Sequence, residues 1–394
     1  MTNNTPANSP TISKAHSIYY FVLIGFCVLF LDEMPVLESI FSNIRLAVAL
    51  IVFIQFFRQR NKISFFLPLM ALYWGVEFYS TYIHAGRIIA VLSYGITLLA
   101  LFMLMQQDLS YAPSDTLRSL SRLFSILIYI NLATVILFPN GIWQAENGSL
   151  RFLIGGNYNQ MGGLIIAGIA TKIASLQFDN SGRSKSLIAL FIASFTTLLI
   201  VGSKTSLVGL TILLIFVITP SQKLKKLGLI VFIFAYFFFQ HITVFNLFEF
   251  SENGYVGQFV TQVLKKDLSF TARSTIWEAT QLTIVRSPII GHGLQDDDWN
   301  YAHIEGLMPH NLVLSILLKG GVLLLGVFII VFIYCLTINI RNHSPSNFYI
   351  LCTVWVLAFM MIMEVYNIGI ICYLLCLMAN GDKLTKKTIQ IEEK

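Results

Sequence analysis

Three basic side chains, from three separate stretches of the sequence, could together bind an anion and move a proton. Lys204 stands in "GSKTS", Arg273 in "TARSTIW" and His310 in "MPHNLVL". A lysine or arginine at the start of a helix suits a phosphate, because the free backbone N–H groups there reinforce its charge. An imidazole can act as a general base or hold a phosphate near neutral pH. We therefore expect an anion site with an acid–base group.

The composition shows what kind of scaffold must position these residues. The chain has 394 residues and is 56% hydrophobic and 12% charged, whereas soluble domains carry roughly 25% charged residues. So much apolar surface requires lipid as its solvent. We therefore expect one integral-membrane domain, residues 1–394, of the all-α polytopic class. The five cysteines lie inside apolar runs, which favours packing over disulfide bonds.

Apolar runs that approach the length of a membrane helix, about 20 residues, recur along the whole chain. The first follows a polar N-terminus without a cleavage site, so we expect it to be retained. The sequence predicts about twelve transmembrane helices, near residues 17–31, 44–57, 63–82, 88–105, 117–138, 159–176, 186–201, 205–219, 227–245, 311–339, 347–363 and 365–380.

The basic residues predict the orientation, since cytoplasmic loops are enriched in lysine and arginine. With the N-terminus inside, most basic residues fall in the cytoplasmic loops, among them Arg58, Arg118, Arg183, Lys223 and Lys383. This favours an N-in/C-in arrangement with an even number of spans. The net charge of +6 is mostly this signal and does not indicate nucleic-acid binding.

One connection, residues 246–310 between spans nine and ten, is much longer than the others and falls on the outer side. Long ordered loops on a rigid scaffold often carry function. Ser269 or Thr271 could cap a helix in this loop and Pro288 would end it. The residues expected on one face of this helix are Arg273, Ile276, Trp277, Thr280 and Ile284. Such a helix would lie along the membrane with Trp277 in the interface.

Two further features of the loop concern metals and the entry to span ten. The acidic run Asp296–Asp298, between His292 and His303, lacks the spacing of a metal motif, so we expect a solvated turn and no metal. Pro309 predicts a helix start with His310 and Asn311 in its first turn.

Span ten also contains a lysine, which is costly inside a membrane. Lys319 would lie about 13 Å deeper than His310 along the helix. Gly320–Gly321 would permit a kink or the close approach of another helix. Glu364 is the candidate partner for Lys319.

Four segments resemble the bacterial O-antigen ligase/polymerase superfamily of membrane glycosyltransferases. They are "GNYNQMGGLI" (156–165), "VGSKTSLVGL" (201–210), "ARSTIW" with "SPIIGHG" (272–293) and "HNLVLSILLKGGVLLLG" (310–326). The resemblance implies that a glycan moves en bloc from undecaprenyl diphosphate to an acceptor hydroxyl. It places this reaction at the outer face of the bacterial inner (cytoplasmic) membrane, without cofactor or metal.

The resemblance also assigns roles to individual residues. Lys204 stands where the family commonly has arginine, Arg273 matches the basic residue of a motif that ends at Trp277, and His310–Asn311 match the start of "H-N/S-x-x-L". The expected catalytic residues are therefore Lys204, Arg273 and His310, with Trp277 and Asn311 in substrate binding. Because lysine cannot grip a diphosphate with two parallel hydrogen bonds, Arg87 and Arg151 are further candidates for substrate binding.

The resemblance leaves several functions open. A repeat-unit polymerase is favoured over a ligase that transfers the finished glycan to lipid A–core. A monomeric-sugar transferase that uses Asp32–Glu33 as catalytic acids, and a glycan flippase or transporter, are the alternatives. The expected partners are the undecaprenyl-diphosphate-linked oligosaccharide, a glycan or lipid-core acceptor and membrane lipid. A chain-length regulator or a flippase could also associate with the protein, and no nucleic acid is expected.

Overall fold

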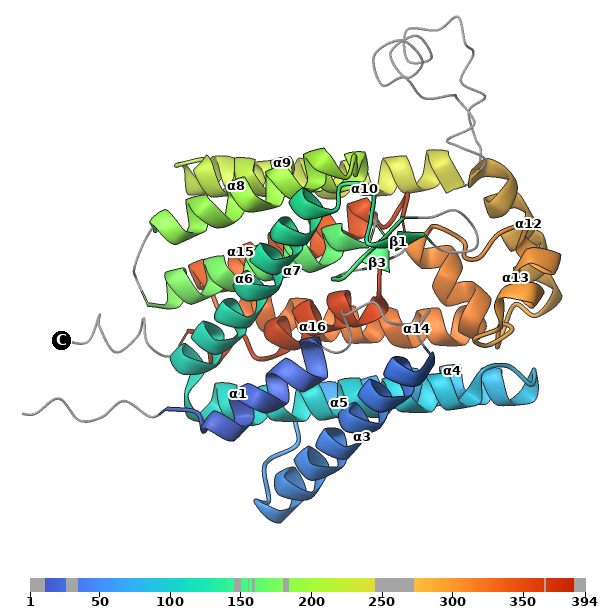
Figure 1. Cartoon of the computed structure of the whole chain (residues 1–394), viewed down its shortest axis with the longest axis horizontal. Helices are drawn as coiled ribbons and strands as arrows, with labels where there is room; N and C mark the ends of the chain where they lie inside the picture. Colours follow the sequence, from blue (N-terminus) through green and yellow to red (C-terminus); the bar gives the residue numbers. More distant parts are fainter. Residues whose placement is uncertain are drawn as a thin grey trace, which may run out of the picture.

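The computed structural model describes residues 11–25, 35–144, 150–154, 156–157, 160–179, 184–244, 273–364 and 366–385. The chain is mostly helical in these parts (Figure 1). The helices are α1 (Lys14–Tyr20), the π-helical η1 (Phe21–Gly25), α3 (Pro35–Arg58), α4 (Phe66–Ile83), α5 (Ile88–Tyr111), α6 (Pro113–Leu137), α7 (Met161–Phe178), α8 (Lys185–Ile200), α9 (Lys204–Ile218), α10 (Gln222–Val244), α12 (Arg273–Arg286), α13 (Asp297–Ile304), α14 (Leu312–Arg341), α15 (Pro345–Met360) and α16 (Ile368–Ala379).

The apolar helices make this a multi-pass membrane protein. Six of the described helices are long and apolar enough to cross a membrane: α3 from Ser39, α5, α6, α7, α10 to His241, and α14. Four shorter apolar helices, α8, α9, α15 and α16, add to them. Each predicted span overlaps a helix among the described residues, although residues 26–31 of the first span lie outside the described part. The number of spans and the N-in/C-in orientation remain predictions.

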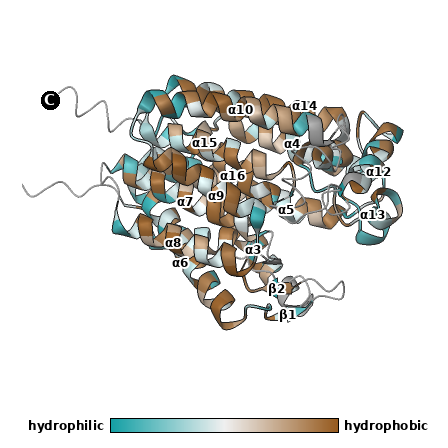
Figure 2. Ribbon diagram, turned by 90° about the horizontal axis from the view of Figure 1, so that it is seen from above, coloured by the Kyte–Doolittle hydropathy of each residue, from teal (hydrophilic) through white to brown (hydrophobic). Residues whose placement is uncertain are grey.

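The core of the bundle is formed by helices that are apolar on every face. Of the apolar window of α7, 83% is buried inside the protein, against 17% for α10. Helix α7 packs between α6 and α15, whereas α10 leaves large side chains such as Phe234 and Phe238 exposed. A helix that is hydrophobic all round suits either a core or contact with lipid. In Figure 2 most of the ribbon of the bundle helices is brown, the hydrophobic end of the scale, as a protein in contact with lipid requires.

Side-chain and backbone contacts define two opposite ends of the bundle. At one end, named here the α12 end, contacts join Arg273 to Glu364, Ser206 to Tyr366, Leu312 to Met361 and Tyr94 to Gly369. At the opposite end, contacts join Ile12 to Asp115, Ser114 to Asp179, Ser346 to Ala174 and Asn347 to Gly381. The described N- and C-terminal parts therefore lie at the same end of the bundle (Figure 1).

A small antiparallel sheet corrects the all-α prediction. Its strands are β1 (Trp143–Gln144), β2 (Leu150–Phe152) and β3 (Gly156–Asn157), in the order β1-β2-β3. Arg151 lies in the central strand and is paired with Trp143 on one side and Asn157 on the other. The strands are only two or three residues long, too short to show an alternating pattern in the sequence.

Helix α14 is interrupted at Gly320–Gly321, which confirms the predicted kink. Gly320 has φ −146° and Gly321 has φ 60° and ψ −161°, both outside the helical region. Another stretch of backbone satisfies the hydrogen bonds that this break frees. His292 N–H donates to Leu318 O at 2.7 Å, and Val322 N–H donates to Pro288 O at 2.9 Å. The segment 288–293 is thereby held against the break by backbone hydrogen bonds rather than by side chains.

Glycine is required where these two backbones meet. A Cβ at Gly291 would lie 2.5 Å from the backbone nitrogen of Gly320, and a Cβ at Gly321 would lie 2.3 Å from the carbonyl carbon of Ile289. Gly321 also has a positive φ, which side chains disfavour. The glycines therefore fix how the end of α12 sits on α14.

Candidate functional site

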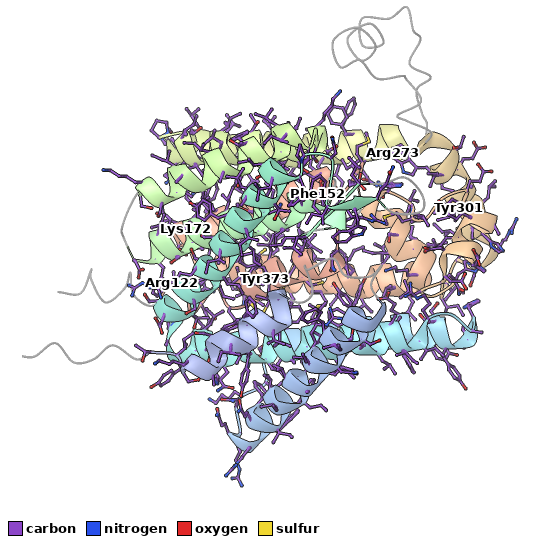
Figure 3. All side chains as sticks on the ribbon, in the orientation of Figure 1. Arg122, Phe152, Lys172, Arg273, Tyr301 and Tyr373 are labelled. Atoms are coloured by element: carbon purple, nitrogen blue, oxygen red, sulfur yellow. The ribbon has the colours of Figure 1, made fainter. Side chains whose placement is uncertain are left out.

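One carboxylate joins two of the three predicted catalytic residues. Glu364 Oε2 accepts a hydrogen bond from Arg273 Nη2 at 2.9 Å, and Glu364 Oε1 lies 3.2 Å from His310 Nδ1. The side chain of Glu364 is 4% exposed, against 14% for Arg273 and 25% for His310. Figure 3 shows Arg273 at the same end of the bundle as Tyr301 of α13, far from Arg122 and Lys172. The arrangement is a buried acid beneath two partly accessible basic groups.

Three elements bring these side chains together. Arg273 is the first residue of α12, and Glu364 lies in the segment 361–367 between α15 and α16. The start of α14 is fixed to that segment, because Leu312 N–H donates to Met361 O at 2.9 Å. The cluster therefore depends on where three chain segments meet, and not on any single motif.

His310 is placed differently from the prediction. It does not lie in the first turn of span ten, because α14 begins at Leu312 and Asn311 is its N-cap. His310 instead has φ 50°, a left-handed conformation that costs about 1–3 kcal/mol and that proteins tend to keep at functional sites. Asn311 accounts for the difference: its side-chain oxygen accepts hydrogen bonds from the N–H groups of Val313 and Leu314, as Asn prefers at a helix start.

Asn311 is fully buried, at 0% exposure, and its role in substrate binding remains a prediction. Its amide exchanges hydrogen bonds at 3.2 Å with the amide of Gln240 in α10. Its Nδ2 also donates to Ile362 O at 3.1 Å. Asn311 therefore ties α10, α14 and the segment 361–367 together, and so positions His310 from the adjacent residue.

Trp277 also lies inside the protein instead of in the membrane interface. It is 2% exposed and packs against Leu314 of α14, beside Ile284 and Met363. The predicted helix is present as α12 and ends before Pro288. Its proposed caps, Ser269 and Thr271, lie outside the described residues. The position of Trp277 anchors α12 on α14 and so orients Arg273, one turn earlier on the same helix.

Lys204 lies at the same end of the bundle and is exposed at the first residue of α9. The two serines beside it form a buried chain of hydroxyl groups. Ser203 Oγ donates to Ser206 Oγ at 2.8 Å, and Ser206 Oγ lies 3.1 Å from the hydroxyl oxygen of Tyr366. This chain joins the start of α9 to the segment that carries Glu364. The helix that begins with Lys204 is thus attached to the segment beside the cluster.

The two further arginines occupy separate positions. Arg87 is exposed at the N-cap of α5, and its backbone N–H donates to Leu294 O at 2.8 Å. Arg151 is half-buried in β2. No described contact joins either side chain to Arg273, Glu364 or His310, so their roles in substrate binding remain predictions.

The predicted partnership of Lys319 and Glu364 is wrong. Lys319 Nζ lies 3.4 Å from Glu77 Oε1 in α4, while Glu364 is occupied by Arg273 and His310. Glu364 is therefore the functional candidate that sequence reasoning left without a role at this site. A signal for it was available, because a lone acid in "MIMEVYN" is costly within an apolar stretch and usually marks a functional site.

The acidic run in the long loop is exposed, as predicted, but it starts a helix instead of forming a turn. Asp296 is the N-cap of α13, and its side chain accepts from Trp299 N–H at 2.8 Å. Trp299 stacks on His303 with ring centroids 4.1 Å apart. Among the described residues, no group of three His, Cys, Asp or Glu side chains could hold a metal ion.

His292 lies beside Trp299, in the segment 288–293 that forms hydrogen bonds with the break in α14. Its Nε2–H donates to Thr283 O at 2.9 Å. Burial lowers the pKa of His292 below its ordinary value, although the bond to Thr283 opposes this shift. A neutral ring with one N–H to donate is what the packing requires here, so His292 is a structural histidine.

The site can bind an anion and accept a proton. Arginine carries five N–H donors, of which Arg273 uses one on Glu364 in the described contacts. A diphosphate oxygen could engage the others, with Lys204 as a second positive charge. His310 is the most accessible of the three cluster side chains, so it can meet a substrate hydroxyl.

Comparison with known proteins agrees with the resemblance. No curated protein matches the chain. The model of the family described as O-antigen ligase matches residues 189–329, which run from α8 into α14 and include Lys204, Arg273 and His310 but not Glu364. This match covers 141 of the 394 residues and supports the O-antigen ligase/polymerase superfamily that the sequence motifs resemble.

Proposed function

We propose that this protein transfers a glycan en bloc from undecaprenyl diphosphate to an acceptor hydroxyl at the outer face of the bacterial inner membrane. The observation that carries the proposal is the Glu364 carboxylate, which holds Arg273 at 2.9 Å and His310 at 3.2 Å. This contact places an anion-binding group and an acid–base group side by side. A displacement with a diphosphate leaving group needs both.

His310 is the general base in this proposal. A carboxylate at Nδ1 favours the tautomer that carries its proton on Nδ1, because that N–H can then donate to Glu364. Nε2 is left with a free lone pair that can accept the proton of the attacking hydroxyl. The imidazolium that forms is stabilised by the same carboxylate. Glu364 thus acts through His310 as a positioning residue.

Arg273 and Lys204 stabilise the leaving group. The acceptor oxygen forms a bond to C1 of the donor sugar as the bond from C1 to the diphosphate oxygen breaks, and negative charge grows on the diphosphate. Positive groups fixed in advance near that charge are usually among the largest contributions to catalysis. Arg273 is fixed by Glu364, and the helix start at Lys204 adds the dipole of α9.

Within this reaction class we favour repeat-unit polymerase over O-antigen ligase, so that the acceptor is a second lipid-linked glycan. The donor and acceptor would be undecaprenyl-diphosphate-linked oligosaccharides held beside membrane lipid, and a chain-length regulator or flippase would be a natural associate. The ligase alternative requires a lipid A–core acceptor. A glycan flippase is disfavoured, because Lys204, Arg273, His310 and Glu364 gather at one end of the bundle instead of along a path through it.

The test is transfer by the purified full-length protein with an undecaprenyl-diphosphate-linked oligosaccharide as the only glycan substrate. A polymerase produces a ladder of longer lipid-linked glycans. A ligase produces nothing until lipid A–core is added, and then a single extended product. Arg273→Ala should abolish either product. A ladder of normal length and rate from Arg273→Ala would overturn the proposed site.

A further inference from the structure

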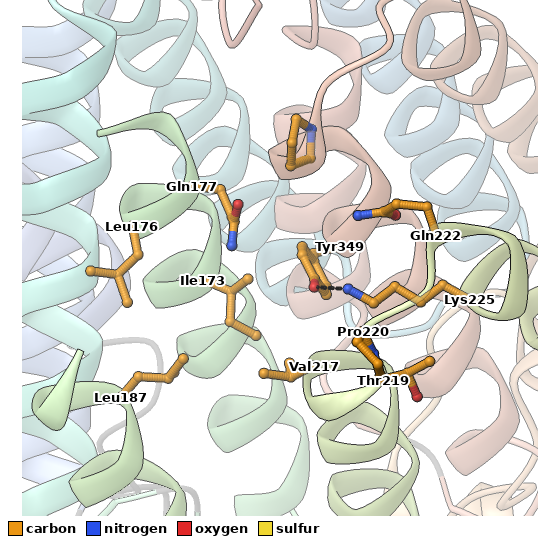
Figure 4. Close-up of a pocket in the computed structure, with 11 residues that line it drawn as sticks. Ile173, Leu176, Gln177, Leu187, Val217, Thr219, Pro220, Gln222, Lys225 and Tyr349 are labelled. Atoms are coloured by element: carbon orange, nitrogen blue, oxygen red, sulfur yellow. Dashed lines mark hydrogen bonds between the residues drawn. The ribbon is translucent and has the colours of Figure 1, made fainter. Parts of the chain in front are cut away.

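A cavity at the end of the bundle opposite the candidate site has the properties of a ligand site. Its volume is about 230 Å³, several times the roughly 30 Å³ that one water occupies in the liquid. Its wall is formed by α7, α8, the α9–α10 turn and the start of α15 (Figure 4). Because α15 runs from this cavity to the segment that carries Glu364, its 16 residues separate the two sites by about 24 Å.

A buried lysine faces this cavity without an acidic partner. Lys225 is 6% exposed, and its Nζ donates to the hydroxyl oxygen of Tyr349 at 2.6 Å and lies 4.9 Å from the centre of the Tyr349 ring. None of the residues that line the cavity is acidic, and Lys225 forms no ion pair with a described carboxylate. An ammonium removed from water without a counter-charge is strongly destabilising. A bound anion would supply this counter-charge.

The remaining lining divides into a polar part and an apolar part. Polar Gln222 and Thr219 lie on the same side of the cavity as Lys225, and polar Gln177 lies across from them on α7 (Figure 4). Apolar Leu176 and Leu187 lie on the α7–α8 side, with Val217 between Leu187 and Thr219. Large apolar side chains next to the cavity, Ile188 and Leu224, are 57% and 59% exposed, as expected of a lipid-facing surface. A ligand with an anionic head and an apolar tail fits both parts.

We propose that this cavity binds the phosphate headgroup of an anionic membrane lipid, with Lys225 as the counter-charge. The exposed lysines on either side, Lys223 and Lys226, raise the positive potential that attracts such a lipid. The bound phosphate completes the ion pair that Lys225 lacks and joins the start of α10 to the start of α15. This site is independent of the proposed transfer reaction.

The test measures thermal unfolding of the purified full-length protein in a neutral detergent. Dioctanoyl phosphatidic acid should raise the midpoint of the wild type by at least about 3 °C at saturation. Dioctanoylglycerol, which has the same chains without the phosphate, should not. An equal shift with dioctanoylglycerol would overturn the anionic site, and a full shift with inorganic phosphate alone would replace the lipid with a free anion.

Two variants locate the effect. Lys225→Met removes the buried charge and should abolish the shift, while Lys62→Met removes an exposed charge outside the cavity and should retain it. A wild-type shift in Lys225→Met would overturn the site. If Lys225→Met does not fold, crosslinking of the wild type with photoactivatable phosphatidic acid identifies the segments that contact the lipid. Adducts within 173–187, 217–225 or 345–349 support the site, and adducts confined to other segments contradict it.

Discussion

The Glu364 carboxylate lies 3.2 Å from Nδ1 of His310, although the two residues are 54 positions apart in the chain. The contact forms because α14 and the segment after α15 are bonded to each other through Leu312 and Met361. It gives His310 a partner that can fix its tautomer and stabilise its protonated form. Glu364 can therefore orient the His310 ring even though it lies in a different chain segment.

Neutralising Glu364 should slow transfer without preventing assembly of the protein in the membrane. In Glu364→Gln the amide still fills the space and its oxygen can still accept from Arg273, but without the negative charge it stabilises an imidazolium less and holds Arg273 more weakly. We expect the transfer rate to fall by about tenfold to a hundredfold. Removal of the general base itself should cost at least about a hundredfold. The steady-state rate with lipid-linked oligosaccharide measures this. Glu278→Gln, at an exposed acid of α12, is the matched control, and equal rates for the two variants would remove Glu364 from the account.

Lys204 should tolerate arginine but not alanine. Arginine keeps the positive charge at the start of α9 and adds two parallel donors for a diphosphate, so Lys204→Arg should retain at least wild-type activity. Lys204→Ala should lower the transfer rate by about tenfold or more, since one preorganised charge is removed from the leaving group. Glycan ladders from cells that carry each variant report both outcomes. Full ladders from Lys204→Ala would show that α9 contributes no charge to the reaction.

The ion pair between Lys319 and Glu77 should contribute to stability rather than to catalysis. Lys319 Nζ lies 3.4 Å from Glu77 Oε1, with side-chain exposures of 28% and 6%. Because Lys319 is partly solvated, breaking the pair should cost about 1–3 kcal/mol, less than a fully buried pair. Lys319→Met and Glu77→Gln should each lower the unfolding midpoint, and the double variant should lose less than their sum. Strictly additive losses would mean that the pair does not interact.

The folded protein should become less stable in mild acid because of His292. Burial lowers the pKa of His292 in the folded state, so below the unfolded value of about 6.5 the unfolded state binds more protons. This contribution to stability is therefore complete above about pH 6.5 and is lost as the pH falls toward the folded pKa. Unfolding midpoints should fall less between about pH 7 and 5.5 in His292→Gln than in the wild type. His343→Gln, at an exposed histidine, should leave the wild-type slope unchanged, and an unchanged slope in His292→Gln would contradict the assignment.

The six long membrane helices could be predicted from the sequence because each is an apolar run of the required length. The break at Gly320–Gly321 could also be predicted locally, because two adjacent glycines permit a kink in a helix. The small sheet around Arg151 could not, since strands of two or three residues carry no periodic signal. Local rules also placed His310 one step too far into its helix, where Asn311 proved the better N-cap.

Side-chain partners were harder to predict than helices, because they depend on distances between remote segments. Arg273 and Glu364 are 91 positions apart, and Lys319 and Glu77 lie on helices α14 and α4. The cost of an unpaired charge in the bundle shows that each needs a partner. It does not show which acidic side chain pairs with which basic one. Glu364 was therefore named, but for the wrong cation, and the pairing in the structure moves it into the candidate site.

The central claim is that chemistry occurs between α12 and the start of α14, with His310 as the base. Transfer from lipid-linked oligosaccharide by purified His310→Ala and Asp32→Asn, with excess chelator present, tests this claim against the acid-dependent alternative. Asp32 lies outside the described residues. The account predicts that His310→Ala loses at least about a hundredfold in rate, while Asp32→Asn and chelator cost little. Transfer that survives His310→Ala but vanishes with Asp32→Asn or with chelator would contradict it.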